Sequence, residues 1–233
     1  MLKLIRRIKR WQRDREISHL RCAHIGKDSE VHSTAQVLGW KNVRIGERSI
    51  VGEHCWLNVN DRESGEVAIT IGNHCFIGRR NFLNSGSRIS IGDYCMTGVD
   101  CHFLGSDHAI DDPFRPYLTT GTTSGGAIVI GANCWFGAGV TVLKGVTIGY
   151  GSVLGARAVV LRDVPPLSVV VGNPGRVVKR FDVRRNTWVP IADYPADGDT
   201  HLPAEEDYLA RLRKAQPTLR GPLIASGHDF GDL

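Results

Sequence analysis

The histidine-bearing stretch at residues 105–109 holds the side chain best suited to proton transfer. His108 lies within it, and histidine titrates near neutral pH, so it can take a proton from a hydroxyl or an amine in a transition state. His102, six residues earlier, is a weaker candidate. A partner would orient the ring through its second nitrogen, and the acidic candidates are Asp107, Asp111 and Asp112. We predict His108 as a general base; the alternative is a surface loop histidine.

Two further sets of polar residues could bind a ligand. The basic residues Arg162, Arg176, Lys179 and Arg180 cluster near the end of the middle region, where guanidinium and ammonium groups would favour phosphate. A solvated basic cap is the alternative. Asn81 and Asn84 could line a site or bind a polar substrate, although asparagine is equally common in turns.

A six-residue repeat must position these side chains. Glycines six apart recur five times, and nearly every one follows an apolar residue. The pairs are Gly46 and Gly52, Gly72 and Gly78, Gly92 and Gly98, Gly131 and Gly137, and Gly149 and Gly155. Their spacing predicts stacked coils of about three hexads each, with insertions near residues 59–67 and 105–127.

The composition of each hexad explains the coil. An aliphatic residue every six positions fills an interior column, a compact residue fits near a corner, and glycine or a polar residue allows the chain to turn. A helix is disfavoured because a period of six does not keep one helical face. Five of the six cysteines occupy the compact position and are interpreted as interior filler: Cys55, Cys75, Cys95, Cys101 and Cys134.

The repeat also locates the histidine. Counting on from Cys101 puts Asp107 in the compact interior position, where an unpaired carboxylate would be costly. We therefore expect the coil to end there and residues 105–127 to leave it as a loop that carries His108. By the same count, Ser87 and Asn81 fall in interior positions.

The repeated Ile-Gly-x-x-Cys/Ser-x pattern resembles the hexapeptide-repeat acyltransferases over about residues 25–180. The resemblance implies an all-β fold, a left-handed parallel β-helix. It also implies a homotrimer with active sites between subunits. The stretch from Asn81 to Arg180 is similar to the sugar O-acetyltransferase branch, through residues 133–137, 162–166 and 172–176. Leu161-Arg162 stands where that branch has Thr-Lys, which removes one hydroxyl near the expected phosphate site.

The resemblance implies direct transfer of acetyl from acetyl-CoA to a hydroxyl of a sugar, polysaccharide or lipid-linked glycan, in a ternary complex and without a metal. His108 would be the base, with Asn84 and Asp107 beside it. The implied cofactor-binding residues are Trp135, Gly137, Gly155 and Ala156 for the pantetheine arm and acetyl group, and Arg162, Arg176, Lys179 and Arg180 for the phosphates. Trp135 could instead simply pack.

Three other interpretations stay open. An amino-sugar N-acyltransferase would use the same base and cofactor. A zinc enzyme like the γ-type carbonic anhydrases would use His74, His102 and His108, but their spacing misses that family's pattern by one residue. A scaffold β-helix without activity would need neither the histidine loop nor the basic closing coil.

Composition and the chain ends narrow the class of protein. The chain has 233 residues with a net charge of +5, concentrated at the N-terminus, and carries no nucleic-acid motif. No stretch spans a bilayer, none is a secretory signal, and the cysteines form no CxxC pair, so a soluble, cytoplasmic protein is expected. Residues 1–23 are predicted as a basic helix that packs on the β-helix or a trimer mate; peripheral contact of residues 1–20 with the inner membrane face is the alternative. The repeat domain is placed at 24–180. The extension 181–233 is expected to be irregular, apart from a helix at 204–215.

Overall fold

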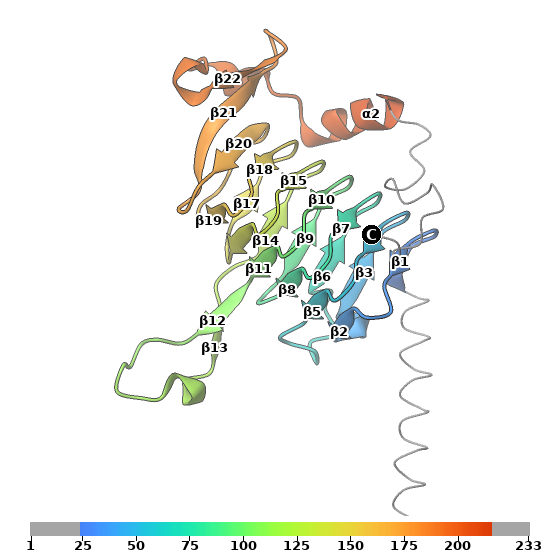
Figure 1. The fold of residues 1–233 in the computed structure, drawn as a ribbon, viewed down its shortest axis with the longest axis vertical. Helices are drawn as coiled ribbons and strands as arrows, with labels where there is room; N and C mark the ends of the chain where they lie inside the picture. The colour runs from blue at the N-terminus through green and yellow to red at the C-terminus, as the bar shows by residue number, and fades with distance from the viewer. Residues whose placement is uncertain (1–23, 216–233) are drawn as a thin grey trace, which may run out of the picture.

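The chain winds into stacked coils whose short strands form three parallel sheets (Figure 1). The computed structural model describes residues 24–215. Sheet A contains β3 (Val43–Ile45), β6 (Ile69–Ile71), β9 (Ile89–Ile91), β14 (Ile128–Ile130) and β17 (Thr147–Ile148). Sheet B contains β1 (Glu30–Val31), β4 (Ile50–Val51), β7 (Phe76–Ile77), β10 (Met96–Thr97), β15 (Trp135–Phe136), β18 (Val153–Leu154) and β20 (Ser168–Val171). Sheet C contains β2 (Gln36–Leu38), β5 (Trp56–Asn58), β8 (Phe82–Asn84), β11 (His102–Leu104), β16 (Thr141–Leu143) and β19 (Val159–Val160).

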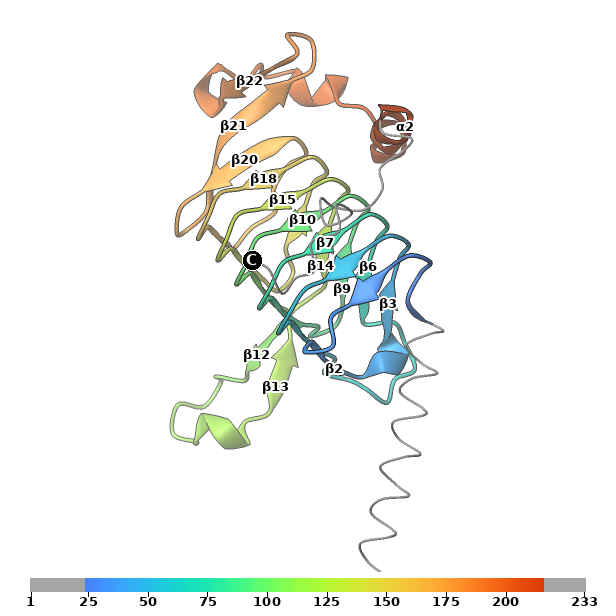
Figure 2. The ribbon, with the colours of Figure 1, turned by 45° about the vertical axis from the view of Figure 1, so that its right-hand side comes forward.

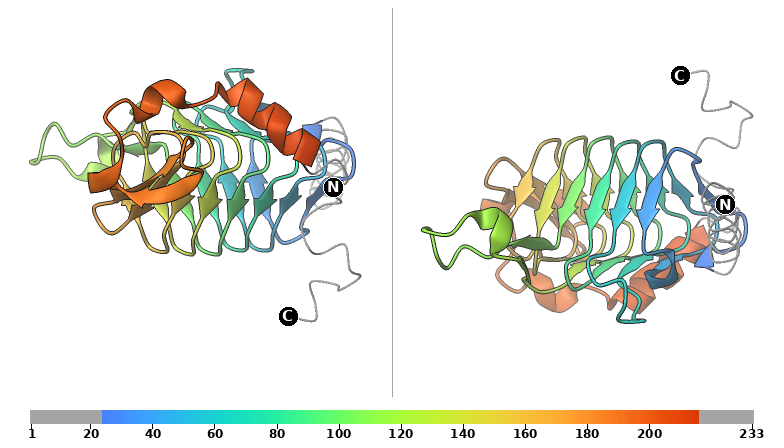
Figure 3. Two further views of the ribbon diagram at one scale, coloured as in Figure 1. Left: turned by 90° about the horizontal axis from the view of Figure 1, so that it is seen from above. Right: turned by 90° about the horizontal axis from the view of Figure 1, so that it is seen from below.

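The hexad pattern produces these sheets because each strand turns its apolar residues inward. Equivalent residues of successive coils pair directly, as Ile71 does with Ile91 and Phe103 with Val142. Both members of each pair are buried. Burial of one such side chain contributes about 1.5–3 kcal/mol, and stacking repeats it from coil to coil. The predicted left-handed parallel β-helix is confirmed (Figure 3).

Three corners join the sheets, and each carries a different feature. The A–B corner holds turns such as residues 92–95, and the B–C corner holds turns such as residues 137–140. The C–A corner holds both predicted insertions. Residues 59–68 separate β5 from β6, and residues 105–127 separate β11 from β14. The larger insertion is an antiparallel hairpin of β12 (Ser106–His108) and β13 (Thr122–Ser124), with η2 (Tyr117–Thr119) between them, and it projects from the coils (Figure 2).

The interior positions follow the prediction with one exception. The five cysteines of the repeat are free and buried, which confirms them as filler. Asn81 is also buried. Ser87 is exposed, contrary to expectation, because its corner buries Ser85 instead. The coil register does end before Asp107, which lies exposed in the hairpin.

The C-terminal part of the described chain closes the coil stack. Strand β21 (Arg176–Asp182) pairs antiparallel with β20 and then with β22 (Thr187–Pro190), so one strand crosses the boundary placed at residue 180. The expectation of irregular structure is wrong for β22, and it did not anticipate the short 3-10 helices η3 (Ile191–Asp193) and η4 (Gly198–His201). The predicted helix is confirmed as α2 (Glu205–Ala215), which lies across the coils at the A–B corner (Figure 3).

The predicted basic helix at residues 1–23 lies outside the described residues, and so does the proposed membrane contact of residues 1–20. Within residues 24–215, no helix has both the length and the apolar character needed to cross a bilayer.

Candidate functional site

His108 ends strand β12, the outgoing strand of the hairpin at the C–A corner. Its side chain is exposed and lines a cavity of about 670 Å³ together with residues from the hairpin and Lys144 from the next coil. Its imidazole makes no hydrogen bond to any other residue in the part of the chain that the structure describes. Both ring nitrogens are therefore available to a substrate or an orienting group.

The acidic residues near His108 differ in their surroundings. Asp107 Oδ2 lies 2.8 Å from Lys144 Nζ, so its carboxylate pairs with the lysine rather than with the imidazole. Asp112 Oδ1 accepts a hydrogen bond from the backbone N–H of Phe114 and serves a turn. Asp111 lines the same cavity as His108. Of the three candidates, Asp111 is the one that lines the cavity without a hydrogen bond or ion pair to another residue in the part of the chain that the structure describes.

Asn84 is linked to the root of the hairpin. Its Nδ2 donates to Ser106 Oγ at 2.8 Å, and its Oδ1 accepts from Asn58 Nδ2 at 2.9 Å. Asn60 Nδ2 also donates to Ser106 Oγ, at 3.0 Å. Because alternate residues of a strand share a face, Ser106 and His108 lie on the same side of β12. The amides of Asn84 and Asn60 therefore fix the strand that carries the histidine.

Asn81 is buried inside the coil and bonds to backbone carbonyls. It is 1% exposed, and its Nδ2 donates to the carbonyls of Gly78 and Gly98 at 2.6 and 2.9 Å. An acceptor substrate could not reach it without opening the coil.

Lys144, Tyr117 and Thr123 also line the cavity and are not among the site residues predicted from the sequence. A signal for Lys144 existed in the paired glycines 125 and 126, on the chain that returns from the hairpin. A Cβ on Gly125 would collide with the aliphatic stem of Lys144, so the glycine makes room for the lysine to reach Asp107.

His102 lies elsewhere, on the outer face of sheet C. It pairs in register with Phe82 on one side and Thr141 on the other, and its side chain is exposed. It lines neither the His108 cavity nor the pocket around His74.

The expected pantetheine contacts lie at the B–C corner and on sheet B. Trp135 is 51% exposed on the outer face of β15, and Ala156 is exposed at the corner. A Cβ on Gly137 would lie 2.6 Å from Ala156 N, and one on Gly155 would lie 2.9 Å from a Val171 methyl. Close stacking of the coils therefore already requires these two glycines, whether or not a cofactor binds there.

The basic residues at the last coil separate into two groups. Arg162, Arg176 and Lys179 are exposed. Arg180 is only 4% exposed, its Nη2 pairs with Asp199 Oδ1 at 2.7 Å, and its guanidinium stacks over Tyr194 at 4.5 Å. Arg180 thus holds the C-terminal extension, and we leave it out of the candidate phosphate site.

Within one chain, His108 and the B–C corner that carries Gly137 and Gly155 are not brought together. Strand β16 starts directly after the turn that begins at Gly137 and ends directly before Lys144, beside the hairpin. The two groups therefore lie at opposite ends of sheet C, about 10 Å or more apart for a three-residue strand with its flanking turns.

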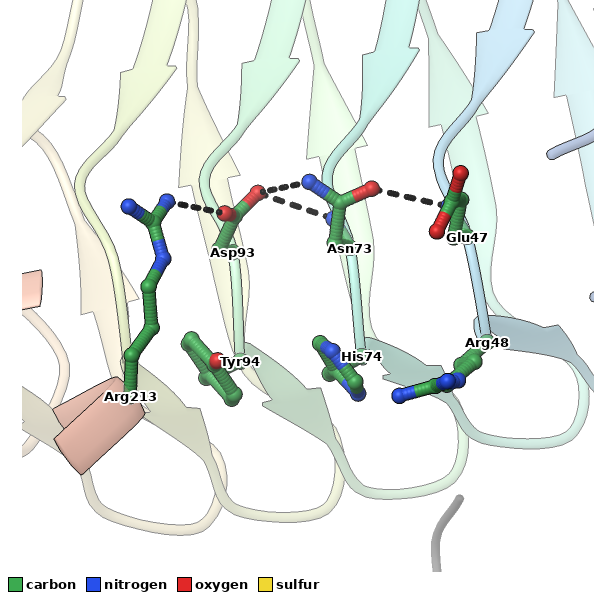
Figure 4. A pocket seen from close by; sticks show the side chains of 7 residues that line it. All are labelled: Glu47, Arg48, Asn73, His74, Asp93, Tyr94 and Arg213. Atoms are coloured by element: carbon green, nitrogen blue, oxygen red, sulfur yellow. Dashed lines mark hydrogen bonds and ion pairs between the residues drawn. The ribbon is translucent and has the colours of Figure 1, made fainter. Parts of the chain in front are cut away.

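His74 lies on a third corner, in a polar pocket of about 440 Å³ (Figure 4). Its ring stacks on Tyr94 at 4.9 Å, beside Arg48, and burial together with the nearby Arg48 charge lowers its pKa. Asn73 joins Glu47 and Asp93 in a hydrogen-bonded row, and Arg213 of α2 reaches Asp93 at 3.4 Å. His74, His102 and His108 occupy an A–B corner, a sheet face and a hairpin, so they do not form a common metal site.

Comparison with known proteins agrees with the repeat. The model of the bacterial transferase hexapeptide (six repeats) matches residues 127–162. A Staphylococcus aureus (strain COL) protein named "Putative acetyltransferase" is 56% identical over 62 residues, or 27% of this chain and 31% of that protein. A Mycobacterium tuberculosis (strain H37Rv) protein named "Probable acetyltransferase" is 38% identical over 97 residues, or 42% of this chain and 31% of that protein. The chain thus spans about a third of the length of these curated relatives.

Among solved structures, AntD shares the fold. This N-acyltransferase from Bacillus cereus, in complex with dTDP and 3-hydroxybutyryl-CoA, gives a TM-score of 0.60 at 17% identity, covering 86% of this chain and 96% of that chain. The repeats match the hexapeptide transferase model over residues 127–162, the curated relatives over the residues they share are named acetyltransferases, and AntD, at 17% identity, shares the fold alone. They leave the O- or N-acetylating branch open.

Proposed function

We propose that this protein transfers acetyl from acetyl-CoA to a hydroxyl of a sugar or glycan, with His108 as general base. The observation that carries the proposal is the hairpin, which holds an imidazole at the edge of a cavity of about 670 Å³ without a hydrogen bond to any residue between 24 and 215. The acetyltransferases that resemble this chain support the acyl-transfer chemistry.

In the proposed reaction, one nitrogen of His108 takes the acceptor proton while the acceptor oxygen attacks the thioester carbonyl. The C–S bond then breaks, the proton passes to the departing thiolate, and the products are an acetyl ester and free coenzyme A. Asn84 acts by holding β12 through Ser106. Asp107 neutralises Lys144 beside the cavity. Close positioning of the two substrates supplies much of the rate.

Coenzyme A is proposed to lie along the B–C corner. Ala156 presents a small exposed surface there, which suits an extended pantetheine arm, and Trp135 stands on the adjoining face of sheet B. Arg162, Arg176 and Lys179, all exposed at the last coil, would hold the phosphates.

A homotrimer completes the proposed site. In one chain, His108 and the B–C corner proposed for coenzyme A lie at opposite ends of the sheet C strands. His108 of one copy would therefore act on the thioester bound by the next copy. Closed cyclic symmetry repeats the same contact at every interface.

A direct assay tests the reaction. Thiol release from acetyl-CoA is followed across a panel of sugar and glycan acceptors, including amino sugars, for wild type and His108→Ala. We expect turnover with a hydroxyl acceptor and a loss of about 10²–10⁴-fold in kcat for the variant. Product analysis by mass spectrometry and alkaline hydrolysis separates an ester from an amide.

His102→Ala is the matched control, because its imidazole is also exposed but lies on sheet C outside the cavity. It should keep the kcat of the wild type. Equal activity of His108→Ala and wild type would refute the base, and acetylation of amino sugars alone would replace the hydroxyl acceptor with an amine.

A further inference from the structure

Two aromatic rings pack against each other, tilted by 31°, on the outer face of sheet C, away from the His108 cavity. Trp56 of β5 and Phe82 of β8 pair in register, and their ring centroids are 4.8 Å apart. Trp56 is 43% exposed although indole is costly to leave in water. The proposed mechanism uses neither ring.

Amides lie directly beside the rings. Two residues further along the same strands, and so on the same face, Asn58 and Asn84 form a hydrogen-bonded pair. Asn84 continues to Ser106 Oγ at the base of the strand that carries His108. Rings and amides thus form one continuous strip, which we call the sheet C strip, made of Trp56, Phe82, Asn58 and Asn84.

Sheet B also presents apolar residues outward, Phe76, Met96 and Trp135, but among the described residues it has no amide pair beside them like that of Asn58 and Asn84. The equivalent outward positions on sheet A are small or polar: Arg44, Thr70, Ser90, Val129 and Thr147. On sheet C, the row through the rings begins with Gln36 and continues to His102 and Thr141, all polar. In register, Gln36 and His102 flank the rings, and Leu38 and Leu104 flank the amides, so polar groups interrupt the apolar surface along this face.

The chemistry of the strip matches a sugar ring. A pyranose has one face of C–H groups, which packs against indole or phenyl, and a rim of hydroxyls that exchange hydrogen bonds with amides. Strand spacing puts Trp56 roughly 15 Å from the start of β12, which is farther than one sugar ring extends.

We propose that Trp56 and Phe82 hold a distal ring of an oligosaccharide acceptor whose reacting ring lies at His108. The acceptor would therefore contain at least two sugar rings and would run from the strip, past Asn58 and Asn84, to the hairpin. This inference rests on the proposed function and specifies its acceptor as a chain of sugars rather than a single sugar.

The test compares acceptor lengths. Mono-, di- and trisaccharides of glucose, galactose, mannose and N-acetylglucosamine are assayed with acetyl-CoA, and their binding without acetyl-CoA is followed by ligand-observed NMR. For wild type we expect kcat/KM to rise about tenfold or more from mono- to trisaccharide. Trp56→Ala should lose that rise through KM, keeping kcat and the monosaccharide activity, and Trp56→Phe should retain most of it.

Trp188→Ala is the matched control, because Trp188 is also an exposed tryptophan beside an aromatic ring, Phe181, but lies on β22. It should keep the length preference. No gain in binding or turnover with length, or a gain unchanged in Trp56→Ala, overturns the proposal, as does a change in oligomeric state in Trp56→Ala by sedimentation. If oligosaccharides bind through Trp56 but no acetyl is transferred, the strip stands and the acetyltransferase function fails.

Discussion

Asn81 illustrates how the same residue type serves the coil at one position and the site at another. It occupies the compact interior column of the B–C corner, and the residues above and below it in that column, Cys55 and Cys101, donate Sγ to the carbonyls of Gly78 and Gly137. Asn81 donates two bonds of the same kind, but its Oδ1 is buried without a hydrogen-bond partner among the described residues. Asn84, three residues later, faces outward and joins the hairpin network.

We therefore predict that Asn81→Cys is tolerated and raises the free energy of unfolding by about 1 kcal/mol. The thiol can donate to Gly98 O, and the buried orphan oxygen, which costs about 1–3 kcal/mol, is removed. Asn81→Asp should instead destabilise strongly, because it buries a carboxylate. Urea unfolding and acetyl transfer measured on both variants check this, and an Asn81→Cys protein with normal stability but weaker acceptor binding would show a direct role for the amide.

At the scale of elements, the cysteines stacked in the coil interior are buried titratable groups. Burial raises the pKa of both Cys55 and Cys101 to about 11. In the unfolded chain these thiols ionise from pH about 9, whereas the folded coil keeps them protonated up to about 11. The contribution of these protonated thiols to the free energy of unfolding is therefore fully present below pH 9 and is lost as the pH rises toward 11.

The free energy of unfolding should consequently fall between pH 9 and 11, by about 2–3 kcal/mol for each of the two thiols. Urea unfolding at pH 8, 9, 10 and 11 measures the fall, and it should be shallower in a Cys55→Ala, Cys101→Ala double variant. An equally steep fall in that variant would assign the alkaline sensitivity to other groups, such as Tyr150, whose pKa burial raises to about 12.

The sequence predicts the coil elements far better than the site. Spacing of glycines is a local signal that every coil repeats, so it locates both insertions and the interior cysteines. The end of the coil register before the loop that carries His108 also follows, because Asp107 cannot occupy an interior column, but the hairpin form of that loop does not. The pairing of Asp107 with Lys144 does not follow, since it depends on how the hairpin leans against the next coil. Nor does the commitment of Arg180 to Asp199, which depends on the path of the C-terminal extension.

At the scale of the whole molecule, the three corners differ: α2 covers the A–B corner, the B–C corner is the proposed coenzyme A side, and the hairpin extends from the C–A corner. In the proposed mechanism, a second copy brings the donor site to the base. The proposed trimer can therefore be tested by activity.

We predict that two inactive variants complement each other. His108→Ala lacks the base, and Ala156→Trp blocks the B–C corner with a bulky exposed side chain that leaves the coil interior intact. After the two are unfolded, mixed in equal amounts and refolded, about a quarter of the sites in random trimers receive both intact parts, so about a quarter of wild-type activity should return. Activity that stays at the level of the separate variants would place base and donor site in one chain.

Helix α2 also limits where coils could be added to the stack. Glu205 Oε1 accepts from Ala132 N, Tyr208 OH bonds Asn133 Nδ2, and Arg213 reaches Asp93 two coils away from the closing strands. Elsewhere on this corner, the side chain of the next coil accepts the equivalent backbone N–H, as Asp93 does from Asn73 and Asn73 from Glu47. Helix α2 thus contacts turns at a fixed spacing along the coil stack. A coil added between Asp93 and Ala132 would move these turns apart, so the helix could not contact both. A coil added before Gly46 would leave them aligned, which makes the N-terminal end the direction in which this fold can grow.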